Sequence, residues 1–139
     1  MRKILFKAKR IDDGKWIEGY YQKRYGLLRN EEHLIFHADS HTVWEYSKID
    51  PKTLCQFTGL CDRYENKIWE NDILMAHLDD DYPEDVTYET IEWNFTGWVT
   101  HETGRTDREY LDEFDLEYFE VVGNIFDNPE LLQEEVRND

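Results

Sequence analysis

The stretch QFTGLCD at residues 56–62, followed by IWENDIL at residues 68–74, decides how this chain folds. A second stretch, VVGNIFDNPELL at residues 121–132, has the same character. In both, Gly, Asn and Asp stand where a chain turns, and the apolar residues beside them require burial. Neither stretch contains a recognisable catalytic or ligand-binding constellation, so both indicate an architecture rather than a reaction.

Length and composition indicate a globular protein. The 139 residues are enough to bury a core without disulfides, and we expect one domain over residues 1–139. Aromatic residues make up 15% of the chain, which argues against disorder although 35% of the residues are charged. Cys55 and Cys61 form no CxxC pair, so we expect reduced thiols. No apolar run approaches the roughly 18 residues of a membrane span. These features favour a cytoplasmic location and no membrane partner.

Charge is distributed unevenly along the sequence. Residues 1–30 carry nine Lys and Arg against three Asp and Glu, whereas residues 71–139 carry three against twenty-one, within a total of −16. Phosphate contacts need clustered basic residues, so the composition disfavours nucleic acid as a partner. The acidic half fits a solvated surface, a basic partner protein, or the basic face of a second copy in a homo-oligomer.

Alternating apolar and polar residues predict strands over most of the chain. Residues 3–22 read as a hairpin around a turn at Asp12–Lys15. Residues 77–88 are acidic and contain a proline, which predicts an exposed loop. The tail predicts a short helix from Pro129, where the missing N–H costs nothing, with Asn128 accepting a hydrogen bond from the first turn.

Three ordered segments carry a resemblance. They are Gln56–Leu60 with Asp62, then Ile68–Ile73, and finally Glu120–Leu132. Together with the opening strand and the later Trp16, these segments resemble the YopX family of bacteriophage and prophage proteins. The resemblance implies a mainly β fold, a bent antiparallel meander or SH3-like partial barrel. It implies no established activity. We therefore expect a non-enzymatic accessory or protein-binding module in the host bacterial cytoplasm, with a phage or host protein as partner.

The motif residues read as mainly structural. Those that match the family pattern are Gln56, Thr58, Gly59, Leu60, Asp62, Ile68, Glu70, Asp72, Gly123, Asn124, Asn128 and Pro129. Two positions depart from it. Asn71 stands where the family has Gly, and Asn is the next-best residue for a left-handed backbone, so the turn can survive. Tyr64-Glu65 stands where the family tends to place Asn-Gly, and we expect Asn66 to supply that turn.

Several polar groups raise chemical alternatives. His33, His37 and His41 are spaced by four, which would suit a metal on a helix, but the segment reads as strand and turn. His77 with residues 79–81 suggests a hard cation, but the alternating ligands and central Gly of a calcium loop are absent, so we favour a solvated acidic loop. Asp62, Glu70 and Asp72 could serve a small hydrolase or metal-dependent enzyme. We favour no catalytic, metal or cofactor site. A further alternative is an acidic DNA mimic that inhibits a host DNA-binding protein.

The aromatic residues exceed what a small core hides easily. They are Trp16, Tyr20, Tyr21, Trp44, Tyr46, Trp69, Trp93, Phe95 and Trp98. We expect at least half of these rings to be buried and the rest to serve protein interfaces. Stacking of single-stranded bases would need basic residues alongside, which only the N-terminal strands provide.

Overall fold

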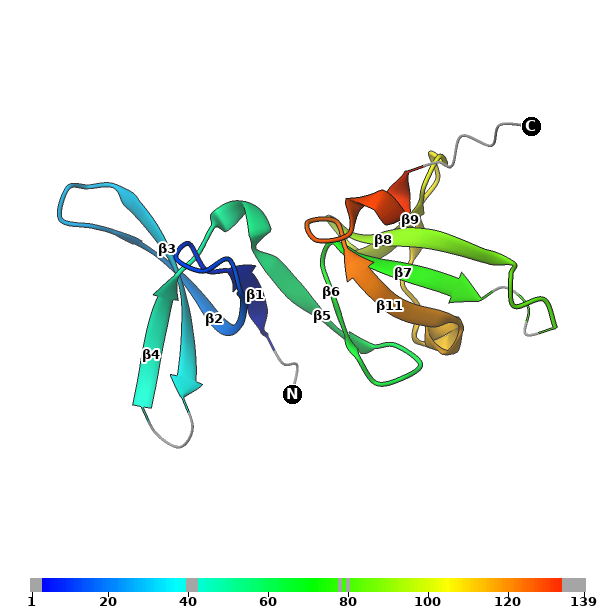
Figure 1. Cartoon of the computed structure of the whole chain (residues 1–139), viewed down its shortest axis with the longest axis horizontal. Coiled ribbons are helices and arrows are strands. Elements are labelled where there is room, and N and C mark those ends of the chain that lie inside the picture. The colour runs from blue at the N-terminus through cyan, green and yellow to red at the C-terminus, as the bar shows by residue number, and fades with distance from the viewer. Residues whose placement is uncertain (1–3, 40–42, 78, 80, 134–139) are drawn as a thin grey trace. The chain divides into compact units, whose positions relative to one another are not determined.

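The computed structural model describes residues 4–39, 43–77, 79 and 81–133. It divides into two compact units, residues 1–57 and residues 58–139, hereafter the N-terminal and C-terminal units. Each is described by itself. Both are built from antiparallel strands, so the prediction of a mainly β protein is confirmed (Figure 1).

The N-terminal unit is a twisted antiparallel sheet. Its strands follow the order β4-β3-β2-β1-β5. Their bounds are β1 Phe6–Lys9, β2 Trp16–Tyr25, β3 Glu31–Asp39, β4 Val43–Lys48 and β5 Cys55–Cys61, with a 3-10 helix, η1, at Pro51–Thr53.

Strand alternation gives the N-terminal sheet one buried face. Ala8, Ile17, Ile35 and Ile49 pack together with almost no exposure. The predicted first hairpin is confirmed, with β1 paired to β2 around a turn in which Gly14 has a φ of +70°. Only glycine adopts that conformation without a steric cost.

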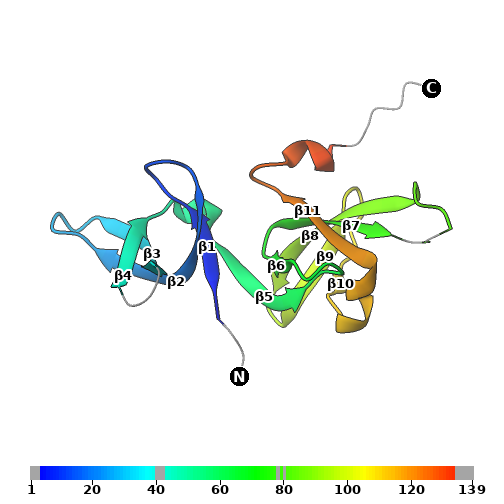
Figure 2. The ribbon, with the colours of Figure 1, turned by 60° about the horizontal axis from the view of Figure 1, so that its bottom comes forward.

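The C-terminal unit holds a five-stranded sheet in the order β10-β9-β8-β7-β11 (Figure 2). Its elements are β6 Lys67–Trp69, β7 Asp72–His77, β8 Val86–Asn94, β9 Gly97–Glu102, β10 Glu109–Tyr110 and β11 Phe119–Asn124, with 3-10 helices η2 at Glu113–Tyr118 and η3 at Pro129–Leu132. Ile68, Leu74, Ala76, Ile91 and Phe119 form its core.

Three expectations about the fold need comment. Both sheets are open along the described residues, and the SH3-like detail is not confirmed. The predicted C-terminal helix is a single 3-10 turn at Pro129–Leu132 within the described chain, and residues 134–139 lie outside it. Pro129 occupies the first turn as predicted, but Asn128 makes no side-chain cap. The division into two units leaves the single domain over residues 1–139 a prediction.

The expectation that at least half of the nine prominent rings are buried is wrong. Trp69 is buried, Trp16, Tyr21 and Trp98 are half-buried, and the other five rings are exposed. Exposure follows from alternation, because every second residue of a strand points away from the core of its sheet.

Cys55 and Cys61 are free thiols, as predicted. In the described part of the chain, no helix has the length and apolar character needed to cross a membrane.

Candidate functional site

Asp62, the central acidic residue of the first motif, joins two distant segments of the C-terminal unit. Its carboxylate accepts hydrogen bonds from the backbone N–H groups of Tyr64, Asn66 and Val121 at 2.9, 2.8 and 2.9 Å. The Asn66 side chain donates a fourth at 3.1 Å. Burial acts to raise the pKa of Asp62, but these bonds together hold that pKa below its ordinary value. The carboxylate therefore serves as a structural anchor.

The turn after Asp62 differs from the expectation for Asn66. The left-handed residue is Glu65, with a φ of 66°. Asn66 contributes through its hydrogen bonds to Asp62 instead. The reason is that a carboxylate at the first position of the turn orders the following amides, so the strained backbone falls one residue earlier.

Asn71 has a φ of 68°, so its predicted left-handed conformation is confirmed. Its N–H donates to the Ile91 carbonyl at 2.8 Å, and its carbonyl accepts from the Ile125 N–H at 3.0 Å. Asp72, which is nearly fully buried, accepts from the Trp69 N–H at 2.8 Å. The tight turn thus connects three strands.

The second motif closes against the first. Asn124 lies opposite Asp72 in the β11–β7 pairing, and its side-chain oxygen accepts from the N–H groups of Phe126 and Asp127 at 3.0 and 2.9 Å. A β-bulge lies between Val121 and Gly123. A Cβ on Gly123 would collide with the Asn128 side chain. The Asn128 side-chain oxygen accepts from the Asn124 N–H and makes no cap bond to η3.

The remaining motif residues are also accounted for by structure. Gln56 on β5 is opposite Phe6 on the neighbouring strand β1. The Thr58 hydroxyl donates to the Ile68 carbonyl at 2.8 Å. Gly59 has a φ of +88°, and Leu60 lies beside it. The other three occupy places already described: Ile68 in the core, Glu70 before the turn at Asn71, and Pro129 in η3. All of these contacts are made within the chain, and the mainly structural role of the motifs stays a prediction.

The histidines do not converge on a helix face. His33 and His37 lie on β3, so about 13 Å separates their positions along the strand. His33 contacts the Tyr21 hydroxyl and His37 the Ser47 hydroxyl. His41 falls outside the described residues. Within the described ranges no three His, Cys, Asp or Glu side chains gather closely enough to hold a metal ion.

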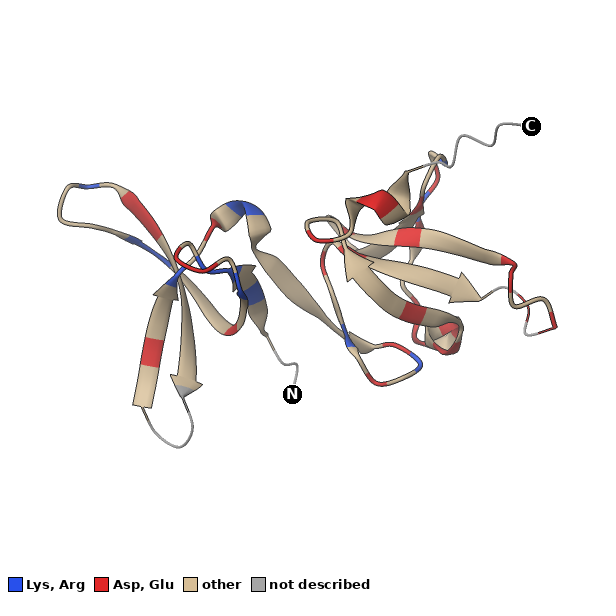
Figure 3. Cartoon of the chain, viewed as in Figure 1, with Lys and Arg blue, Asp and Glu red and all other residues tan. Residues whose placement is uncertain are grey.

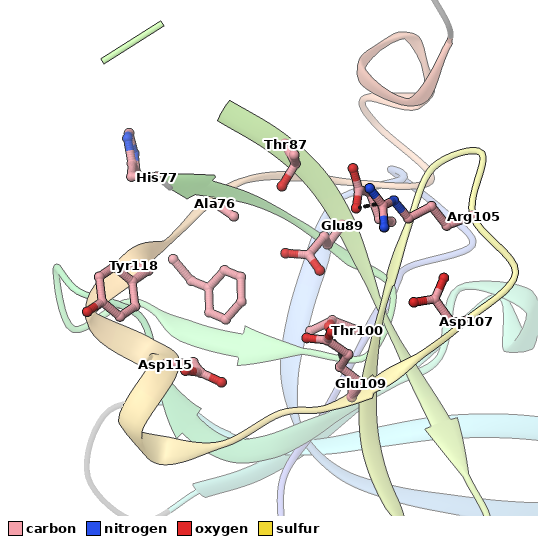
Figure 4. A pocket seen from close by; sticks show the side chains of 12 residues that line it. Ala76, His77, Thr87, Glu89, Thr100, Arg105, Asp107, Glu109, Asp115 and Tyr118 are labelled. Carbon is pink, nitrogen blue, oxygen red and sulfur yellow. Dashed lines mark hydrogen bonds and ion pairs between the residues drawn. The ribbon is translucent and has the colours of Figure 1, made fainter. Parts of the chain in front are cut away.

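A pocket of about 430 Å³ lies in the C-terminal unit. It occupies the face of the sheet that carries the core residues Leu74, Ile91 and Phe119 farther along. Its lining is Ala76, His77, Thr87, Glu89, Thr100, Glu102, Arg105, Asp107, Glu109, Asp115, Tyr118 and Phe119 (Figure 4). The register explains this grouping, since Glu89 is opposite Glu102 and Thr100 is opposite Glu109.

The pocket has a strongly negative lining. Five of its residues are carboxylates, and its one arginine, Arg105, is engaged by Glu102 at 3.0 Å. Burial raises the pKa of Glu89 above its ordinary value, and the nearby Glu102, Glu109 and Asp115 raise it further against a hydrogen bond from Thr100. Carboxylates that repel each other beside an apolar wall stabilise a bound cation.

Sequence reasoning missed this pocket. The acidic residues that line it lie between positions 89 and 115, on three strands, a loop and η2. Their shared face depends on the register of β8, β9 and β10, which a single sequence does not reveal. The available signal was the alternation of Thr87, Glu89 and Ile91, which places an acidic residue on the same side of β8 as a buried aliphatic residue.

Comparison with known proteins supports the fold. The model of a family described as YopX protein matches residues 5–133. Among curated proteins, none matches the chain. The crystal structure of protein EF1440 from Enterococcus faecalis superposes with a TM-score of 0.61 and 21% sequence identity, covering 96% of this chain and 100% of that one. This structural likeness concerns the fold alone.

Proposed function

Because the chain belongs to the YopX family, we propose that it is a non-enzymatic binding module whose acidic pocket receives a basic side chain of a partner protein. The partner is a phage or host protein, and the binding takes place in the cytoplasm of a bacterium that carries the phage or prophage. The observation that carries the proposal is the pocket itself, with five carboxylates and one apolar wall.

A lysine or arginine side chain fits this lining chemically. Its aliphatic stem can lie against Ala76 and Phe119, while its charged head reaches the carboxylates. Hydrogen bonds between a guanidinium and a carboxylate are about twice as strong as neutral ones. The volume of about 430 Å³ lies in the range of ordinary ligand pockets. Glu89 gains most from such a partner, because a cation favours its ionised form.

The arrangement of Asp62 and Asp72 supports binding over catalysis. Both carboxylates accept hydrogen bonds from backbone amides and hold turns together. To act on a substrate, the two carboxylates would have to release those backbone amides. Each buried amide left without an acceptor costs about 1–3 kcal/mol.

A peptide titration tests the proposal. The isotope-labelled full chain is titrated by NMR with acetyl-Gly-Arg-Gly-amide and, separately, with the same peptide carrying citrulline, which is neutral and nearly the same shape. We expect only the arginine peptide to shift the amide signals of Glu89, Thr100 and Asp115. Glu89→Gln should weaken this binding about tenfold, because one charge-assisted hydrogen bond is removed.

A matched control uses Glu113→Gln, since Glu113 lies on η2 but does not line the pocket. That variant should bind like the unmodified chain. Equal shifts from both peptides, or shifts confined to residues outside the pocket, would count against the proposal. Light scattering during size-exclusion chromatography at low and moderate salt identifies the other partner class. A mass above 16.9 kDa that Glu89→Gln reduces would show that the basic side chain comes from a second copy.

A further inference from the structure

Five aromatic rings share one face of the N-terminal sheet. The pairings Lys9 with Trp16, Tyr20 with Phe36, Phe36 with Tyr46 and Ala38 with Trp44 place all five on the same side. Hereafter this side is the aromatic face, with the rings Trp16, Tyr20, Phe36, Trp44 and Tyr46. It is opposite to the side that holds the core residues Ala8, Ile17 and Ile35.

Four of the five rings, Tyr20, Phe36, Trp44 and Tyr46, form a continuous row. Tyr20, Phe36 and Tyr46 are direct neighbours on three successive strands, which are about 5 Å apart. The centroids of Phe36 and Tyr46 are 5.8 Å apart. The ring centroids of Trp44 and Tyr20 are also 5.8 Å apart. The small side chain of Ala38, which pairs with Trp44, leaves room for this contact. The row therefore extends over β2, β3 and β4 without interruption.

Much of the row is accessible. Tyr20, Trp44 and Tyr46 keep 55, 58 and 51% of their surface exposed. Exposing three large rings to water costs free energy unless a partner covers them, at about 25 cal/mol per Å² of apolar surface left in solvent. A contiguous exposed apolar patch of this kind marks an interaction site.

Cations lie beside the rings on the same face. The Lys7 and Lys9 ammonium groups are 4.7 and 5.5 Å from the Trp16 ring centroid. The Arg24 guanidinium is 4.8 Å from that of Tyr46. Lys48 shares the face through its pairing with Leu34. Glu32, on the same face, pairs with both Arg24 and Lys48, at 2.8 and 3.5 Å. The sequence of residues 1–57 contains eleven Lys and Arg against eight Asp and Glu, a net charge of +3 in a chain of −16. Figure 3 shows the contrast, with blue segments on β1 and β2.

We propose that the aromatic face binds single-stranded nucleic acid. Aromatic rings that accept bases, together with cations that bind the phosphates, are the combination that such sites use. The rings rest on three hydrogen-bonded strands, and flat bases can stack on successive rings of the row. Lysine favours this occupant over a protein, because lysine is depleted in protein interfaces whereas it neutralises phosphate well.

The acidic C-terminal unit opposes the approach of phosphates through its charge, and stacking on the rings has to outweigh that repulsion. It carries five Lys and Arg against twenty-four Asp and Glu over residues 58–139. At physiological salt, exposed charges farther apart than about 8 Å are largely screened. The charge of the whole chain therefore disfavours double-stranded DNA more than a short single strand held on stacked rings.

Fluorescence anisotropy with the full chain tests the proposal. The probe is a fluorescein-labelled oligothymidine of about 12 nucleotides, within the site sizes of about 4–16 nucleotides typical of single-strand binding domains. We expect saturable binding that weakens as salt rises. Trp44→Ala and Tyr46→Ala should each reduce affinity at least about fivefold, because a base is deprived of its stacking partner. Trp44→Phe keeps a ring and should retain most of the affinity.

Two matched controls separate stacking and charge from general effects. Phe95→Ala removes a ring that is 95% exposed in the C-terminal unit and should leave binding unchanged. Replacing Lys7 and Lys9 by Gln should reduce the slope of log affinity against log salt by about 0.7 for each phosphate that is no longer neutralised. Lys52→Gln, in η1 of the same unit, should leave the slope unchanged.

Three results overturn the proposal. One is the absence of saturable binding by the unmodified chain at about 50 mM salt, where phosphate binding is strong. Another is an equal reduction of affinity in Trp44→Ala and Phe95→Ala. The third is a dimer in light scattering that Trp44→Ala converts to a monomer, which would assign the aromatic face to an interface between two copies.

Discussion

The two units use their strands for opposite purposes. In the C-terminal unit, polar motif residues turn inward, and Asp62, Asp72 and Asn124 bond backbone amides. In the N-terminal unit, four aliphatic residues hold one side of the sheet, and the other side shows half-exposed rings. Most residues of the family motifs therefore make their contacts inside the C-terminal unit, whereas Gln56 pairs with Phe6 in the N-terminal unit. The aromatic rings of the N-terminal sheet and the acidic pocket around Glu89 lie outside these motifs.

The strongest test of this comparison is Asp62→Ala. The change removes a buried acceptor of four hydrogen bonds and leaves the amides of Tyr64, Asn66 and Val121 without it. We expect a decrease of about 3 kcal/mol or more in the free energy of unfolding, measured by urea denaturation. Asp112→Ala, which removes one exposed cap bond to the Phe114 N–H, should cost about 1 kcal/mol.

The same carboxylate predicts a pH dependence. The folded-state pKa of Asp62 is below its ordinary value, so its stabilisation is complete above the unfolded-state pKa. It is lost as pH falls through the folded-state pKa. The difference in stability between the unmodified chain and Asp62→Ala should therefore shrink in strong acid. A difference that stays constant down to about pH 2, well below the ordinary Asp pKa, would contradict the anchoring role.

Gly123→Ala tests the packing of the second motif at a smaller scale. Its Cβ meets the Asn128 side chain, so we expect a decrease of about 1–3 kcal/mol in the free energy of unfolding, again by urea denaturation. Asn128→Ala alone removes the bond to the Asn124 N–H and should cost about 1 kcal/mol. In the double variant the two closest contacts, with the Asn128 amide group, are absent and only the contact with the Cβ of residue 128 at 2.9 Å remains, so its total cost should be smaller than the sum of the two single costs. Full additivity would show that the clash is not the cause.

Glu89→Gln should have a smaller effect of opposite sign. The folded-state pKa of Glu89 is raised, so its ionised form opposes folding at neutral pH, and this cost disappears as pH falls toward the unfolded-state pKa. We expect the variant to be more stable by less than about 1 kcal/mol at pH 7, after allowance for solvent screening. Thermal unfolding at pH 7 and at about pH 4, near the ordinary Glu pKa, measures it. A gain that persists at the lower pH would argue against repulsion in the pocket.

The smallest effect is expected on the aromatic face. Tyr46→Ala removes a ring that is half exposed, so its stability should change by no more than about 1 kcal/mol. Ile35→Ala, on the buried side of the same sheet, should cost about 2–5 kcal/mol. Urea denaturation of both variants compares the two sides directly. Comparable costs would mean that the ring supports the fold rather than a partner.

The sequence predicted the turns better than the surfaces. Asn71 and the first hairpin could be predicted, because a left-handed position or a turn depends on a few adjacent residues. The hydrogen bond between Asp62 and Val121 could not, since 59 residues separate them and no local pattern reports a distant amide. The pocket around Glu89 and the row through Tyr20 depend on strand register in the same way.

The hydrogen bond from Val121 to Asp62 also bears on how the chain folds during synthesis. The hairpins β1–β2, β2–β3 and β3–β4 join neighbours in sequence, so they can form as soon as they leave the ribosome. β11 pairs with β7 across more than forty residues. The hydrogen bond between Asp62 and the Val121 N–H spans 59 residues. Non-local pairings of this kind close slowly. Synthesis proceeds at about 5–20 residues per second. The N-terminal unit is therefore made several seconds before Val121, whose N–H completes the hydrogen bonds of Asp62 in the C-terminal unit.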